Sequence, residues 1–458
     1  MDRMSPVDAS FLYIEGETQY MHIASVGIFE GPPPGLSEIL EMVSSKLHRV
    51  PRYRQVVRFV PFDLGSPVWT DDPHFNLRYH VRHTALPAPG GEDQLRNLVG
   101  RVMAQRLDRG KPLWEMWIVE GLEDGRWAML SKTHHCMVDG VAGTDLLAVI
   151  MDLEPNPVHE APPDWVPEPP PSDTELISDA VRQRVISPAA VVRGARDLLR
   201  APRRLASQLR DLGTGAGSLA HLVEPVDLEL NGPVGPHRRW DWARTSLADI
   251  RTVRRAFGGT VNDVVLSVIT KGFRNLLRAR RQDVEDKVVR SLIPVSVRRE
   301  DERGHYDNRV SVMFADLPVG IEDPLKRLES IRAQMDELKE KKQAVAAEVL
   351  TALTGFAPPM ILGVTQRVLA RLPQRNVQTV TTNVPGPQIP LYAAGRKMLH
   401  AMPYVPLAAS VRIGIAIFSY NGEVSFGVTG DYDTAPDIHV LCHGIEEGME
   451  ELLKRAAA

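Results

Sequence analysis

The sequence predicts a mixed α/β protein folded in two lobes, and three observations point to this class. Its 458 residues are enough for two large domains or three of average size. Eight prolines fall within residues 155–171, a density that excludes helix and interior strand and favours an extended connector. Strand-like and helix-like segments alternate on both sides of this connector. We therefore expect a first lobe over residues 1–154, a proline-rich linker and arginine-rich helical connector over 155–239, and a second lobe over 240–458.

In the first lobe, the apolar residues of 36–47 recur at helical spacing and predict an amphipathic helix. Residues 113–119 and 127–133 are strand-like runs joined by the turn Glu123-Asp124-Gly125, so they predict a hairpin. Residues 144–153 have the composition of a short apolar helix.

In the second lobe, residues 261–277 predict a mostly buried helix, and residues 324–342 a charged helix with one apolar face. Asn421-Gly422 separates two strand-like runs, 413–420 and 423–429, and Asn-Gly between strands is a strong hairpin signal. Thr434-Ala-Pro-Asp437 predicts the start of a final helix. Shorter strands are expected over residues 291–297, 310–314 and 377–382.

The composition excludes several classes of function. Basic and acidic side chains number 54 and 58, and the net charge of −4 provides no overall attraction for nucleic acid. The two cysteines, Cys136 and Cys442, rule out a disulfide framework and suit a reducing compartment. The first residues lack the apolar core of a signal peptide, and no long apolar run of membrane-spanning length exists. The sequence therefore predicts a cytoplasmic protein that does not span a membrane.

One segment is distinctive chemically: His134-His135-Cys136-Met137-Val138-Asp139-Gly140, between a predicted strand and a predicted helix. A side chain at a strand end is aimed by rigid structure, while the adjoining loop leaves it accessible. Because the pKa of histidine is about 6.5, such a histidine can take a proton from a hydroxyl and return it to a leaving group. Gly140 removes a side chain where a substrate passes close to the backbone.

On these residues alone, other interpretations stay open. The two histidines can be ordinary polar residues at a strand end, or they can ligate a metal together with Asp139. Neighbouring side chains on a strand point to opposite faces, so His134 and His135 are poorly placed to share one ion. Four fixed positions in seven would arise by chance only about 0.002 times in such a chain, which makes the motif specific.

The motif and several further segments resemble one family. HHxxxDG is the motif of the acyltransferase superfamily that includes chloramphenicol acetyltransferase and the peptide-synthetase condensation domains. The opening Ser5-Pro-Val-Asp-Ala-Ser-Phe-Leu12 resembles that of the bacterial wax ester synthase/acyl-CoA:diacylglycerol acyltransferases, with Val7 for the usual leucine. Nearly the full chain is similar to the actinobacterial triacylglycerol synthases. Matching segments follow in family order at Met21-His22, Pro112-Leu113-Trp114, Asn262-Asp263, Pro294-Val-Ser-Val-Arg298, Asn383-Val-Pro-Gly-Pro387 and Gly430-Asp431.

This resemblance implies two chloramphenicol-acetyltransferase-like lobes, arranged as a condensation-domain-like pseudo-dimer with an active-site tunnel between them. It implies that His135 is the general base, Asp139 a structural aspartate and His134 a supporting residue. The hydroxyl of a diacylglycerol or a long-chain alcohol then attacks the thioester of a long-chain acyl-CoA directly, without an acyl-enzyme. Acyl-CoA is a substrate in this scheme, and neither a cofactor nor a metal is expected.

Other segments of the resemblance each have a functional and a structural interpretation. Asn262 is either a donor to the developing oxyanion or, like Asp263, a residue that caps a helix start. Pro112-Leu113-Trp114 is either a wall of the acyl tunnel or ordinary strand core. Arg298 is either the partner of Asp139 or a surface arginine.

The region from Arg182 to Arg210 holds eight arginines and one acidic residue among its leucines, a net charge of +7. It suits binding to an anionic lipid surface, at the inner membrane or on lipid droplets, and it equally suits a solvated connector along the lobes. Two rival functions also stay open. One is a condensation-type domain that forms amides or esters from carrier-bound acyl groups, and the other is an inactive lipid-surface binding protein.

Overall fold

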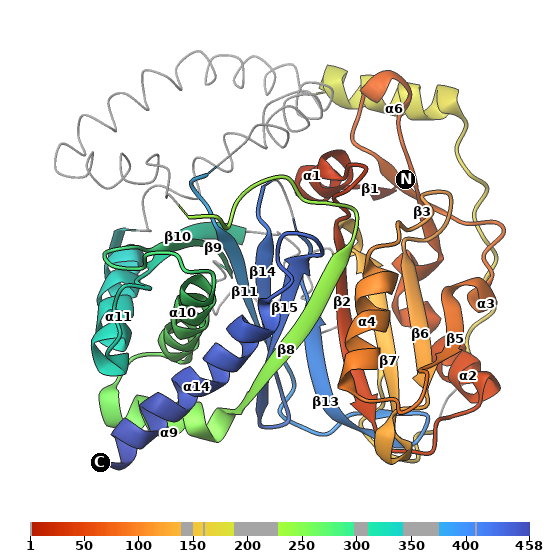
Figure 1. Ribbon diagram of the computed structural model, residues 1–458. Helices are drawn as coiled ribbons and strands as arrows, with labels where there is room; N and C mark the ends of the chain where they lie inside the picture. Colours follow the sequence, from red (N-terminus) through yellow and green to blue (C-terminus); the bar gives the residue numbers. More distant parts are fainter. Residues whose placement is uncertain are drawn as a thin grey trace.

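The computed structural model describes residues 2–138, 150–158, 161–186, 228–296, 310–341, 375–407 and 410–458. Within these ranges the chain forms two six-stranded sheets and one small three-stranded sheet. The two large sheets stand side by side, and helices pack on each of them (Figure 1). This is the two-lobed α/β arrangement that the sequence predicts.

The first large sheet has the strand order β12-β13-β2-β7-β6-β5. Strand β7 lies between β2 and β6 and pairs antiparallel with both, and β5 joins β6 in parallel. The predicted hairpin is confirmed, and its turn has positive φ angles of 61° at Asp124 and 68° at Gly125. The predicted helix at residues 36–47 is confirmed as α2. The elements of this lobe are β2 (His22–Phe29), β5 (Val81–Ala85), β6 (Trp114–Glu120), β7 (Trp127–His134), α1 (Pro6–Ile14), α2 (Leu36–Lys46), α3 (Leu77–His80) and α4 (Glu92–Met103).

Two strands of this first sheet come from the far end of the chain. Strand β13 (Arg396–Tyr404) pairs antiparallel with β2, and β12 (Tyr392–Ala393) pairs with β13. The sequence placed all of residues 240–458 in the second lobe, and here the structure differs. Alternation of apolar residues indicates that a segment can form a strand, but it carries no information on which sheet edge will receive that strand. The second half of the chain therefore contributes a pair of strands to the sheet of the first lobe.

The second large sheet has the order β10-β9-β11-β14-β15-β8. The structure confirms the strands predicted near residues 291, 310, 377, 413 and 423 and the three predicted helices. The Asn421-Gly422 turn has positive φ at both residues, 45° and 87°, as this type of hairpin requires. The elements are β8 (Arg238–Ser246), β9 (Val289–Ser296), β10 (Val310–Leu317), β11 (Thr379–Pro385), β14 (Ile413–Tyr420), β15 (Glu423–Asp431), α9 (Leu247–Phe257), α10 (Val261–Ala279), α11 (Pro324–Lys341) and α14 (Ile438–Ala457).

Helix α10 lies in the core of the second lobe and crosses α14 closely. A Cβ atom on Gly272 would lie 2.7 Å from the carbonyl oxygen of Leu441, and one on Gly444 would lie 2.8 Å from the Cα of Gly272. Only glycine allows the two backbones to approach this far. The crossing fixes the position of α10, whose first turn carries Asn262 and Asp263.

A small sheet of β1 (Asp2–Arg3), β4 (Val68–Asp71) and β3 (Gln55–Arg58) adjoins the first lobe. Helix α6 (Asp173–Ile186) packs near it through buried Leu176 and Ala180. Residues 161–172 form neither helix nor strand, as their proline density predicts. Most of residues 182–210 and most of the helix predicted at 144–153 lie outside the described residues. Among the helices that the structure describes, none is long and apolar enough to cross a membrane.

Candidate active site

The two motif histidines lie where β7 ends. His134 is the last residue of β7 and pairs with His22 of β2, and His135 begins the short 3-10 helix η5 (His135–Met137). The backbone of His135 is held on both sides. Its N–H donates to the carbonyl of Met21 at 2.7 Å, and its own carbonyl accepts the N–H of Val138 at 3.2 Å. Regular structure therefore aims this residue, as the sequence predicts for a base at a strand end.

The ring of His135 stacks on the ring of Phe11 from α1. The two ring centroids are 3.9 Å apart and the planes differ by 23°. Burial lowers the pKa of His135 to about 4. The imidazole is therefore neutral near pH 7 and free to accept a proton, which is the protonation state that a general base needs.

His134 has different surroundings, because its side chain points into the lobe and is 1% exposed. Its Nδ1 accepts a hydrogen bond from the N–H of Cys136 at 3.2 Å, and its Nε2 lies 3.6 Å from Oε1 of Glu15. Burial lowers the pKa of His134 as well. Burial also raises the pKa of the Cys136 thiol well above its usual value, so this cysteine is a poor nucleophile.

Glu15, which directly follows α1, forms the centre of a buried polar cluster. Its side chain is 1% exposed, and its Oε2 accepts from Nη2 of Arg109 at 2.6 Å and Nη2 of Arg106 at 3.2 Å. Its Oε1 faces Nε2 of His22 at 3.5 Å and Nε2 of His134 at 3.6 Å. Burial alone raises the pKa of Glu15, but these neighbours outweigh it and lower the pKa to about 2.

No sequence pattern indicates that Glu15 belongs to the site. It lies 119 positions before His134, and no pattern distinguishes a buried carboxylate from a solvated one. The cluster has the donor types of a metal site, but both arginines contact Oε2. Among the described residues, no three His, Cys, Asp or Glu side chains are grouped so as to hold a metal ion.

The segment Pro112-Leu113-Trp114 lies in the core of the first lobe. Leu113 and Trp114 are each 1% exposed, and the carbonyl of Leu113 accepts the N–H of His134 at 2.9 Å. The ring of Trp114 is stacked between Tyr53 and His80, with centroid distances of 4.4 and 4.6 Å. These residues thus support the strand that carries the histidines.

Asn262 and Asp263 lie in the first turn of α10. Asp263 forms a capping box with Thr260: its carboxylate accepts the N–H of Thr260 at 2.7 Å, and its own N–H donates to the Thr260 hydroxyl at 3.3 Å. This is the structural interpretation that the sequence allowed for Asp263. Asn262 instead accepts a hydrogen bond at its Oδ1 from Nδ2 of Asn383 at 3.4 Å. The structure therefore joins two of the family-like segments, Asn262-Asp263 and Asn383 to Pro387.

Three predicted site residues, Asp139, Gly140 and Arg298, lie outside the described residues, and their roles stay predictions. The chain is described again from Ile150, where it is firmly anchored. Nζ of Lys46 donates to the carbonyl of Ile150 at 2.5 Å and to Oδ1 of Asp152 at 2.6 Å. Both charged side chains are 6% exposed, so a buried ion pair fixes the chain that follows the motif segment.

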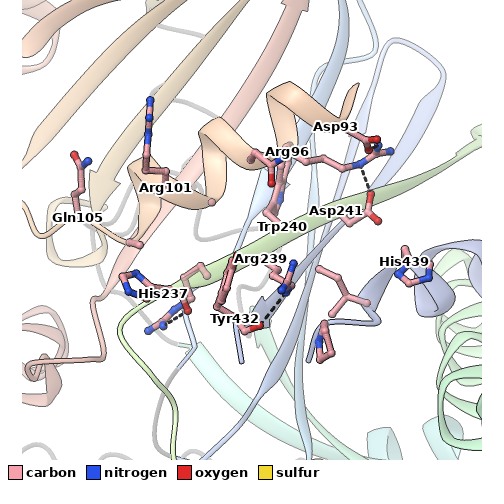
Figure 2. A pocket seen from close by; sticks show the side chains of 16 residues that line it. Asp93, Arg96, Arg101, Gln105, His237, Arg239, Trp240, Asp241, Tyr432 and His439 are labelled. Atoms are coloured by element: carbon pink, nitrogen blue, oxygen red, sulfur yellow. Dashed lines mark hydrogen bonds and ion pairs between the residues drawn. The ribbon is translucent and has the colours of Figure 1, made fainter. Parts of the chain in front are cut away.

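A groove of about 890 Å³ runs between the lobes, along α4 on one side and β8 on the other (Figure 2). Arg96 of α4 bridges it through a hydrogen bond of 2.5 Å to Asp241 of β8. Nε of Arg239 donates to the carbonyl of Tyr432 at 2.9 Å. Among the described residues, His134 and His135 do not line this groove.

Comparison with known proteins agrees with these features. Residues 4–265 match the wax ester synthase/diacylglycerol acyltransferase catalytic domain, and residues 306–453 match the C-terminal domain of the same family. The probable diacylglycerol O-acyltransferase tgs1 of Mycobacterium tuberculosis is 37% identical over 462 residues, which cover 99% of this chain and 96% of that protein.

Solved structures confirm the fold. The wax ester synthase/diacylglycerol acyltransferase from Marinobacter aquaeolei superposes with a TM-score of 0.72 at 24% identity, covering 100% of both chains. The first condensation domain of the calcium-dependent antibiotic synthetase superposes with a TM-score of 0.55 at 13% identity, covering 100% of this chain and 96% of that one. The predicted condensation-domain-like pair of lobes is thus confirmed. The chain belongs to the wax ester synthase/diacylglycerol acyltransferase family.

Proposed function

We propose that this protein is an acyl-CoA-dependent O-acyltransferase that esterifies a lipid alcohol. The observation that carries the proposal is His135, a neutral imidazole at a strand end, inside an HHxxxDG motif, with its backbone fixed by Met21 and Val138. The family and the name of the mycobacterial relative favour diacylglycerol as the acceptor, with triacylglycerol as the product. A long-chain alcohol, giving a wax ester, is the second acceptor that the family name includes.

In the proposed reaction His135 takes the proton of the acceptor hydroxyl as that oxygen attacks the thioester carbonyl. The carbonyl π electrons move onto its oxygen and give a tetrahedral oxyanion. The oxyanion then collapses, the carbon–sulfur bond breaks, and the thiolate of coenzyme A takes the proton from the imidazolium. The products are the ester and free coenzyme A, and His135 returns to its neutral state.

Other predicted residues would support this step. Asn262 is the candidate donor to the oxyanion, because its Oδ1 is engaged by Asn383 and its NH₂ is left to donate. We assign Asp139 a structural role, with Arg298 as its ion-pair partner. Gly140 leaves room for the substrate. No cofactor enters the scheme.

Diacylglycerol and long-chain alcohols dissolve poorly in water, so either acceptor must reach the enzyme from a lipid phase. We assign contact with the anionic surface of the inner membrane or a lipid droplet to the arginine-rich region from Arg182 to Arg210. Flotation with vesicles of anionic lipid tests this assignment. Replacing four of these arginines by glutamate should abolish flotation, and unchanged flotation would overturn the assignment.

The test of the function itself follows a labelled acyl-CoA with diacylglycerol, with a long-chain alcohol, with an amine, and without an acceptor. We expect ester and free thiol only with the two alcohols. His135→Ala should lose about 10²- to 10⁴-fold in rate, whereas His443→Ala on the exposed face of α14 should not change it. Amide formation would favour a condensation-type reaction, and thioester cleavage at the same rate in His135→Ala would exclude HHxxxDG chemistry.

A further inference from the structure

The buried carboxylate of Glu15 is a part of the histidine site that the HHxxxDG motif does not include. It lies next to His134 on one side and accepts from Arg109 and Arg106 on the other. Both arginines are partly exposed, at 32% and 45%, whereas Glu15 is 1% exposed. A carboxylate so deeply buried stays charged only because cationic partners accompany it. Its placement therefore depends on specific neighbours.

The hydrogen bond from Cys136 defines the tautomer of His134. Because the Cys136 N–H donates to Nδ1, that nitrogen is an acceptor and carries no proton. The neutral ring then carries its proton on Nε2, the atom that faces Oε1 of Glu15 at 3.6 Å. A negative oxygen at this place favours the Nε2–H tautomer over the alternative. Glu15 thus acts on the same ring that caps the backbone of η5.

Glu15 is also joined to the other ring that touches the base. Its backbone N–H donates to the carbonyl of Phe11 at 3.3 Å, at the C-terminal end of α1. Arg109 donates to the carbonyl of Leu12 at 2.9 Å as well as to Glu15. The cluster therefore anchors the end of α1, the helix from which Phe11 stacks on His135.

We infer that Glu15 is a positioning residue for acyl transfer: it holds His134 as the Nε2–H tautomer and anchors α1, and through both it orients His135. The inference rests on the proposed function, since it assigns His135 as the base. It also assigns His134 a defined task, which is to link the carboxylate to the turn that presents His135. An error of about 1 Å in the position of a catalytic group can cost about 10²-fold in rate.

The decisive variant is Glu15→Gln, with Glu17→Gln as the control, because Glu17 is exposed two residues later. In Glu15→Gln the two arginines claim the amide oxygen, so the amide NH₂ turns toward the Nε2–H of His134 and two donors face each other. We expect kcat to fall about 10- to 100-fold, with KM for acyl-CoA within about twofold. Ring ¹⁵N NMR of His134 should show the Nε2–H tautomer in the wild type and its loss in the variant.

A second variant separates positioning from stability. Glu15→Gln combined with Arg109→Gln removes one cation together with the anion. We therefore expect the double variant to melt at a higher temperature than Glu15→Gln alone. The low kcat should persist, because His134 still lacks its carboxylate. If kcat returns together with stability, or if Glu15→Gln leaves kcat and the tautomer unchanged, the inference is wrong. Absence of ester formation in the wild type would instead overturn the proposed function, while the tautomer measurement would still test the contact.

Discussion

Phe11 lies almost flat against His135, 3.9 Å between ring centroids, although the two residues belong to different ends of the first lobe's sequence. The stack covers one face of the His135 ring and contributes to the burial that lowers the pKa of His135 to about 4. Helix α1, which begins at Pro6, therefore forms part of the surroundings of His135, the residue that follows β7.

Replacing Phe11 by alanine should raise the pKa of His135 from about 4 toward its usual 6.5, because water reaches the ring. At pH 6 most of the base would then be protonated, and kcat/KM should fall relative to its value at pH 8. The wild type should show no such fall between pH 8 and 6. The measurement is the pH profile of kcat/KM, with Phe62→Ala as the control because Phe62 is 79% exposed. Identical profiles for wild type and Phe11→Ala would show that the stack does not tune the base.

As pH falls, the free energy of unfolding should decrease at pH values where kcat/KM of the wild type is still unchanged. The pKa values of His22, His134 and His135 are all lowered by burial, so below pH 6.5 the unfolded chain binds protons that the folded chain does not. Glu15, with its pKa lowered to about 2, adds stability that is present above pH 4.5 and lost as pH falls below it. The free energy of unfolding should therefore drop between pH 7.5 and 5, by about 2 kcal/mol for His135 alone. Urea titrations of wild type and His135→Ala measure this, and an equal drop in both would assign the effect to other groups.

The two motif histidines should respond differently to alanine. His135→Ala should melt close to the wild type while losing most of its turnover, because its contact with Phe11 is a ring stack and not a hydrogen bond. His134→Ala should melt lower, because it leaves a cavity and an unpaired Cys136 N–H beside a buried carboxylate. Its turnover should exceed that of His135→Ala. Thermal melts and rates measured side by side decide this, and an active His135→Ala with an inactive His134→Ala would reverse the assignment of the base.

The ion pair of Lys46 and Asp152 should be one of the costlier ones to break. Lys46→Met removes the ammonium partner from the carboxylate of Asp152, which is 6% exposed, at a cost of up to about 3–5 kcal/mol. Adding Asp152→Asn removes the buried negative charge and should recover part of the loss. Lys454→Met, at a lysine that is 77% exposed, serves as the control. Equal unfolding midpoints for Lys46→Met and the wild type would mean that the pair does not anchor the chain after the motif.

Sequence predicted the parts of this molecule that depend on near neighbours. The Asn421-Gly422 hairpin and the capping box at Thr260 and Asp263 are such features, because a few adjacent residues determine them. His135 could also be singled out as the candidate base, since its motif is contiguous. In contrast, the contact of Glu15 with His134 and the pairing of β13 with β2 join segments far apart in the chain. These contacts depend on how whole elements pack, and no local pattern of residues encodes that.

The last prediction concerns Asn262 and its neighbours at the start of α10. Asp263→Ala removes the carboxylate that accepts the N–H of Thr260 and keeps the backbone bond to the Thr260 hydroxyl, so it should cost about 0.5–1.5 kcal/mol of stability with little change in kcat per folded enzyme. Asn262→Ala should leave the stability nearly unchanged. It should lose about 10²- to 10³-fold in kcat if its NH₂ donates to the oxyanion.

Asn383→Ala extends the comparison to strand β11 of the same lobe. It removes the hydrogen bond to Oδ1 of Asn262 and so frees that amide to rotate, for which we expect a milder loss of turnover than in Asn262→Ala. Because Asn383 acts through Asn262, the double variant should be no slower than Asn262→Ala alone. Rates of the three variants, each corrected for the folded fraction, form a double-mutant cycle. Additive losses would show that the two residues act independently. Full turnover in Asn262→Ala would show that Asn262 has only a structural role in the first turn of the helix.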